Sequence, residues 1–182
     1  MSPTAMSPSP AAARPSPRQP TTINTRPTTR LHVFVAGGGE PRELGLGYRA
    51  VEHPNGSGGT KVPVLNTLLD VDSVGVVQVA VGLKHAAALT HDGRVLTWGS
   101  NIFFALGRET VGVEAEATPG TVPGLEALDV VQVAATDHTT WIVTANGWVY
   151  GWGSFMVSIP RAPYMISAPL LPRLAPSHVQ HD

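Results

Sequence analysis

Few residues in this chain have the types and spacing that catalysis or metal binding requires. The sequence contains no cysteine, which excludes a thiolate metal site, a cysteine nucleophile and a disulfide. His178 and His181 have the spacing of a metal-binding pair on a helix, but they lie in a proline-rich terminus without a third ligand. Gly56–Lys61 has Gly-Thr-Lys where a phosphate loop needs Gly-Lys-Ser/Thr, so we interpret it as a loop between repeats. We therefore expect no enzyme active site, no metal and no cofactor.

One histidine within the body of the chain, His85, is a candidate of another kind. A histidine can act as a general base, but no nucleophile accompanies His85 in a recognisable arrangement. A neutral imidazole can donate one hydrogen bond and accept another, which suits it to joining strands. We predict a structural hydrogen bond for His85.

The elements that must position these side chains repeat at a fixed interval of 54 residues. Residues 76–100 align without a gap on residues 130–154, and 11 of the 25 positions are identical. The pentapeptide VVQVA opens both copies, and Trp-Gly-Ser ends both. A repeat of this period indicates stacked or radial units that cannot bury their faces alone.

Each copy has the pattern of a small antiparallel sheet. Short apolar runs lie at 76–80, 86–90 and 94–98, and no helical periodicity crosses them. Asp92-Gly93 in one copy and Asn146-Gly147 in the other favour a tight hairpin, because both residues of such a pair tolerate a positive φ. The sequence therefore predicts an all-β fold.

Certain repeat residues are expected to hold neighbouring units together. Trp98 and Trp152 can pack between units, while Gly99 and Gly153 let the backbone bend without a Cβ clash. A partial third copy lies at 31–47, where Gly37 precedes Leu44-Gly45 with the spacing that Gly99 has to Leu106-Gly107. We accordingly expect three copies, near 31–47, 76–110 and 130–155, in which Leu106 and Gly107 are structural residues.

Together these motifs resemble the regulator of chromosome condensation family, and most closely the fungal Ran guanine-nucleotide exchange factors. The resemblance covers roughly residues 31–155, and it is carried by VFVAGGGEPRELGLG (33–47), SVGVVQVAVGLKHAAALTHDGRVLTWGS (73–100), ALGRET (105–110) and VVQVAATDHTTWIVTANGWVYGWGSF (130–155). It implies a seven-bladed β-propeller, of which this chain would form about two to three blades. It also implies a nuclear protein that docks the small GTPase Ran on one face and meets chromatin through the other face and an N-terminal tail.

The resemblance also implies which loop residues would face Ran. Asp137 and Glu40 match acids of the Ran-facing loops, and both would meet basic residues of the GTPase. At Ile102 an acid that the family usually has is missing. His85 matches a repeat histidine that ties strands together.

The two ends of the chain differ in composition from its body. Residues 1–30 hold seven of the 17 prolines and four arginines but no acid, so we expect a disordered tail that binds DNA weakly or serves as a linker. Residues 156–182 form a divergent proline-rich segment, which we also expect to be disordered. No apolar run approaches the 18 or so residues of a membrane span, so we expect no membrane contact.

The repeat motif breaks off after Phe155, where the family continues with a short insertion that forms a wedge against Ran. We interpret the chain as a truncated member or as a splice or reading-frame artefact, inactive in exchange by itself. The alternative is a non-catalytic β-repeat interaction module or fragment. An unclosed array exposes strand edges, so we expect self-association.

Overall fold

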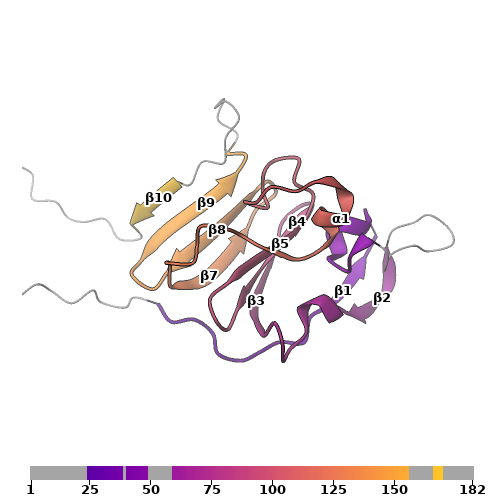
Figure 1. Ribbon diagram of the computed structural model, residues 1–182, viewed down its shortest axis with the longest axis horizontal. Coiled ribbons are helices and arrows are strands. Elements are labelled where there is room, and N and C mark those ends of the chain that lie inside the picture. Colours follow the sequence, from indigo (N-terminus) through magenta and orange to yellow (C-terminus); the bar gives the residue numbers. More distant parts are fainter. Residues whose placement is uncertain (1–23, 39, 49–58, 156–165, 170–182) are drawn as a thin grey trace, which may run out of the picture.

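The computed structural model describes residues 24–38, 40–48 and 59–155, together with the backbone of residues 166–169. Three antiparallel sheets follow one another along the chain and lie side by side, as neighbouring blades of a propeller do (Figure 1). We name them blade 0, blade 1 and blade 2 in chain order. Blade 0 consists of β1 (Phe34–Gly37) and β2 (Thr60–Leu65), and blade 1 of β3 (Val76–Val81), β4 (His85–Thr90), β5 (Val95–Gly99) and β6 (Gly120–Thr121). Blade 2 consists of β7 (Val130–Ala135), β8 (Thr139–Thr144), β9 (Trp148–Gly153) and β10 (Ile166–Pro169). The prediction of an all-β partial propeller is confirmed.

Helical structure in the described residues is short. The α-helix α1 (Gly112–Ala117) lies between β5 and β6, and 3-10 turns occupy Pro41–Leu44 and Thr67–Leu69. No helix in the described part of the chain is long and apolar enough to cross a membrane.

The two copies of VVQVA fold identically down to their irregularities. In blade 1 the register between β3 and β4 shifts at Val77, since Val76 lies opposite Thr90 and Gln78 opposite Leu89. In blade 2 the same shift occurs 54 residues later, at Val131. A bulge of this kind bends a strand and increases its twist, so both blades turn in the same way against their neighbours.

Blade 1 is buried on both faces because it lies between the other two. Val76 and Trp98 pack with Val33 and Leu69 toward blade 0. On the opposite face Val77 packs with residues of blade 2; this second cluster contains Leu89, Val95, Val122, Leu125, Val130, Val133, Ile142 and Trp152. All six residues of β4 are buried, and its small side chains allow the blades to approach closely.

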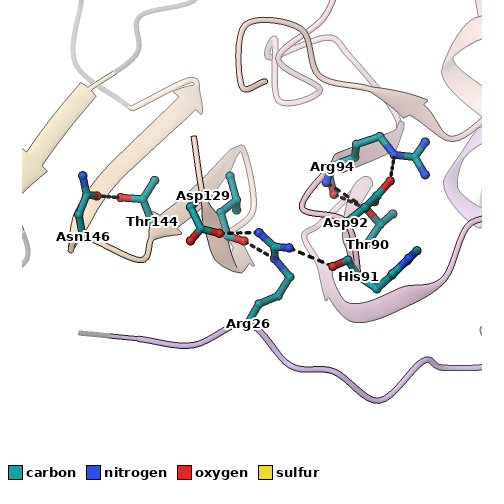
Figure 2. Close-up of polar contacts among 9 residues, drawn as sticks. Arg26, Thr90, His91, Asp92, Arg94, Asp129, Thr144 and Asn146 are labelled. Carbon is teal, nitrogen blue, oxygen red and sulfur yellow. Dashed lines mark hydrogen bonds and ion pairs between the residues drawn. The ribbon is translucent and has the colours of Figure 1, made fainter. Parts of the chain in front are cut away.

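The hairpin turns are where predicted, but their backbone differs from the prediction. Only the glycine of each pair has a positive φ, +90° at Gly93 and +85° at Gly147. The preceding Asp92 and Asn146 keep ordinary backbone angles, and their side-chain oxygens accept a hydrogen bond from the hydroxyl of the threonine two residues earlier (Figure 2). Each turn is therefore a three-residue loop with a glycine bulge. The side chain of Asp92 or Asn146 stabilises it by a local hydrogen bond, without a positive φ at that residue.

Residues 1–23, 156–165 and 170–182 lie outside the described residues. Three described segments differ from the sequence prediction. Residues 24–30, which were assigned to a disordered tail, lie along the body, and Leu31 N donates to Val76 O at 2.7 Å. The backbone of Ile166–Pro169 pairs with β9, where it satisfies the open edge of that strand. Thr60 and Lys61, assigned to a loop from the sequence, begin β2.

Candidate partner-binding face and the contacts that position it

Three loops converge at one end of blades 1 and 2, and we name this surface the loop face (residues 82–84, 101–104 and 136–138). Ser100 N donates to Lys84 O at 2.7 Å, which holds the loop after β5 beside the loop between β3 and β4. The Phe103 ring lies 3.9 Å, centroid to centroid, from the His138 ring in the loop between β7 and β8. The three loops therefore form one continuous surface contributed by two blades.

Asp137 lies at the tip of this surface in a turn with a fixed backbone. Thr136 N donates to Thr139 O at 2.9 Å, and the two threonine hydroxyls are 2.6 Å apart. The Asp137 residue is exposed, and no ion pair reaches it from any residue that the structure describes. Its carboxylate is thus presented to solvent from an ordered support.

Glu40, the other predicted acid, has a different environment. It forms an ion pair with Arg42, whose guanidinium also bonds Glu116 at 2.5 Å. The hydrogen bond that Arg42 donates to Glu116, together with the one that it donates to Glu40 and the two negative charges, raises the pKa of Arg42 above its ordinary value against the effect of burial. Two carboxylates share one guanidinium here, so much of the charge of Glu40 is already compensated within the protein.

Asn101 organises the loop after β5. Its side-chain amide donates to Arg108 O at 3.0 Å and to Thr110 Oγ1 at 3.1 Å, while its side-chain oxygen accepts from Leu106 N at 3.1 Å. Its backbone N–H reaches Glu116 Oε1 at 3.3 Å, which connects this loop to the cluster around Glu40. The loop is therefore held at both ends of its turn.

His85 joins blade 1 to blade 2 through a buried chain of hydrogen bonds. Its Nε2 lies 2.9 Å from Thr140 Oγ1, and that hydroxyl donates to Ala105 O at 2.8 Å. Since the hydroxyl has one hydrogen, it accepts from His85, whose proton therefore sits on Nε2. Burial lowers the pKa of His85, and the charge of His138 adds to this effect, so the imidazole is neutral in the fold.

Each repeat tryptophan inserts into the Leu-Gly motif of the preceding blade. Trp98 of blade 1 lies against Gly45, where a Cβ would come within 2.6 Å of the indole. Trp152 of blade 2 lies against Gly107 in the same way and donates from Nε1 to Ala105 O at 2.9 Å. Leu106, which precedes that glycine, is fully buried. The Leu-Gly motif is thus the socket for the tryptophan of the next blade.

Gly99 and Gly153 follow these tryptophans at the ends of β5 and β9. Their φ values are +105° and +114°. A Cβ on Gly99 would overlap Lys84 O, and one on Gly153 would overlap His138 O. Both glycines therefore allow the strand end to pass close under the loop face.

A second contact between the blades, made by Gln78, was not predicted from the sequence. The side-chain amide of Gln78 donates to Val133 O at 3.2 Å, and its oxygen accepts from Val133 N at 3.1 Å. Gln78 thereby pairs with the next blade as a strand backbone would. The signal was present in the sequence, because Gln132 occupies the same position in the second VVQVA.

The N-terminal segment, predicted to belong to the tail, is fixed across both blades by Arg26. Its guanidinium bonds Val130 O at 2.7 Å, His91 O at 2.9 Å and Asp129 Oδ1 at 2.6 Å, and Figure 2 shows it between the two blades. Arg30 adds contacts to Asp72 O and to the His91 ring. Both arginines contact His91, which follows the end of β4 away from the loop face, beside the hairpin turn.

No group of three or more potential metal ligands gathers within the described residues. The His178 and His181 pair lies outside them.

Known proteins resemble this chain in sequence. The model of the regulator of chromosome condensation (RCC1) repeat matches residues 76–103 and 92–143. The protein pim1 of Schizosaccharomyces pombe is 42% identical over an alignment of 144 residues, which covers 72% of this chain and 26% of pim1. The guanine nucleotide exchange factor SRM1 of Saccharomyces cerevisiae is 34% identical over an alignment of 152 residues, which covers 69% of this chain and 30% of SRM1.

The fold is also similar to that of a solved relative. Prp20p of Saccharomyces cerevisiae, described together with its binding properties to Gsp1p and histones, superposes with a TM-score of 0.66 and 32% sequence identity. The match covers 79% of this chain and 36% of the Prp20p chain. The chain therefore spans about a quarter to a third of the length of the curated relatives that it matches.

Proposed function

Because this chain belongs to the regulator of chromosome condensation (RCC1) family, we propose that its loop face docks a Ran-type small GTPase as part of a guanine-nucleotide exchange factor. The observation that carries the proposal is the exposed carboxylate of Asp137 on an ordered turn, with which no residue in the described part of the chain forms an ion pair. An exposed loop residue held by a rigid scaffold is a common way for a fold to present a binding group. The naming of SRM1 as an exchange factor supports the same assignment.

Exchange by such a protein needs no bond-making chemistry. A partner that binds the empty GTPase more tightly than the loaded one must, by thermodynamic reciprocity, weaken nucleotide binding. This requires several docking points on one rigid ring. A charge-assisted contact at Asp137 contributes roughly 1.5–3 kcal/mol, whereas association costs several kcal/mol. We therefore propose that this chain alone docks weakly and does not accelerate nucleotide release.

The experiment combines a binding measurement with a release measurement. The ¹⁵N-labelled chain is titrated with a nucleotide-free Ran-type GTPase, and we expect the amide signal of Asp137 to shift. Asp137→Ala should weaken the interaction, while the matched control Asp72→Ala, an exposed acid near the opposite end of the strands, should leave it unchanged. Release of a fluorescent GDP analogue in the presence of catalytic amounts of the chain should proceed at the intrinsic rate.

Two results would contradict this assignment in different ways. Many-fold acceleration of release would show that the chain is an exchange factor in its own right. An unchanged spectrum at saturating GTPase would rule out docking and favour the non-catalytic interaction module.

The proposal extends to a nuclear, chromatin-associated role. Prp20p is described with its binding to histones, which supports such a role in this family. Arg14 and Arg18 in the N-terminal tail would supply weak, salt-sensitive contacts with phosphate. Arg26 and Arg30 would not, because their guanidinium groups bond the body.

A further inference from the structure

The centre of the loop face is apolar rather than charged. Ile102, Phe103 and Phe104, which we name the apolar tip, project from the loop after β5 with exposed fractions of 72%, 38% and 48%. Leu83 in the adjacent loop is also more than half exposed. Single exposed apolar residues are ordinary on protein surfaces, but a contiguous group of large ones marks an interaction site.

The apolar tip is held in its exposed position by the loop. Phe104 N donates to Asn101 O at 2.9 Å, and Gly107 N donates to Phe104 O at 3.2 Å. Phe104 has a φ of +57°, the only positive value at a non-glycine residue in the described part of the chain. A bulky side chain in this region is strained, and such strain persists only where the surroundings determine the conformation.

The charges around the apolar tip define what would bind it. Phe103 lies against His138, so Asp137 borders the tip on one side. Ser100 N donates to Lys84 O, so Lys84 lies in a loop that also borders the tip. A complementary surface has an apolar depression with a basic group beside it, to meet Asp137, and an acidic group, to meet Lys84. Charges of opposite sign around the tip would fix the orientation of a partner, whereas buried apolar area supplies most of its affinity.

We propose that the apolar tip is the main contact through which this chain binds the Ran-type GTPase, with Asp137 acting at its rim. This inference rests on the proposed function, and it assigns the binding energy to residues 102–104 rather than to the acids. The GTPase is the occupant because the tip is continuous with Asp137 across the adjoining Phe103 and His138 rings.

The test uses two isoleucines of the intact chain as probe and internal control. Methyl-labelled Ile102 reports on the tip, and Ile142, which is fully buried, reports on the core. On titration with nucleotide-free GTPase the Ile102 methyl signal should shift and broaden while that of Ile142 stays in place. A shift at the Asp137 amide without one at Ile102 would refute the inference and leave the proposed function intact. No shift at either would refute both.

Variants separate the tip from general surface effects. Ile102→Asp and Phe104→Gly should each weaken GTPase binding at least tenfold; the glycine also relieves the positive φ, so folding is preserved. Val62→Asp is the matched control, because Val62 is 69% exposed and lies on blade 0, away from the tip. This variant should bind the GTPase as tightly as the unmodified chain does. Equal affinity in all variants would overturn the inference. An Ile102 signal that moves with concentration of the chain alone would assign the tip to a second copy instead.

Discussion

Replacing Gly107 with alanine should destabilise the protein more than replacing a glycine of similar backbone conformation elsewhere. Gly107 has a φ of +61°, and a Cβ at this position would lie 2.5 Å from Trp152 Nε1. The positive φ costs an alanine roughly 1–2 kcal/mol. The overlap must displace the indole from its socket, which adds roughly 1–3 kcal/mol of overpacking and about 1 kcal/mol for the hydrogen bond to Ala105 O.

Gly124 supplies the matched control. Its φ is +80°, and nothing lies within 4 Å of the position that its Cβ would occupy. Gly124→Ala therefore bears the backbone cost of roughly 1–2 kcal/mol alone, whereas Gly107→Ala should lose about 3–6 kcal/mol in total.

Equilibrium unfolding in urea, followed by far-UV circular dichroism, measures both free energies, and tryptophan fluorescence reports on the displaced indole. If the two variants unfold with free energies within about 0.5 kcal/mol of each other, the socket does not hold the blades together and the reasoning is wrong.

Three further predictions concern charged and titratable groups. Burial lowers the folded-state pKa of His85, so the contribution of this histidine to stability should be complete above about pH 6.5 and lost as the pH falls. His85→Gln should therefore flatten the decline of Tm between about pH 7.5 and 5.5. Arg26→Gln should lower the free energy of unfolding by about 1–3 kcal/mol, and since two of its three partners are carbonyls, the loss should persist in high salt, unlike that in Asp129→Asn. Retention on DNA at low salt should fall when Arg14 and Arg18 are replaced by glutamine but not when Arg26 is, and an equal fall for Arg26 would show that its guanidinium leaves Asp129.

Sequence alone predicted the fold class, the period and the strands of the two complete copies, because the apolar runs and the Trp-Gly motif recur in register. It placed both hairpin turns correctly but misjudged their geometry, since only the glycine of each pair has a positive φ and Asp92 instead accepts a hydrogen bond from Thr90. The short strand β6 was missed, and the glutamine that recurs in VVQVA did not reveal the partner of Gln78, because both contacts are with residues distant in the sequence.

The partner-binding face was only partly predictable. The resemblance pointed to Asp137 and Glu40 alike, but only the structure distinguishes them, through the guanidinium of Arg42 beside Glu40. The role of Arg26 could not be predicted from the composition of the proline-rich segment. Its guanidinium donates to backbone carbonyls of two blades that lie much later in the sequence.

The tryptophan sockets determine how such proteins can be divided and recombined. Trp152 belongs to blade 2, but the glycine that receives it belongs to blade 1. A chimera that exchanges one whole blade therefore alters two joints at once, the socket that the new blade offers and the indole that it inserts. A crossover placed within a blade, instead of between blades, keeps each Leu-Gly motif on the same segment as the tryptophan that inserts into it. Every indole then retains its own socket.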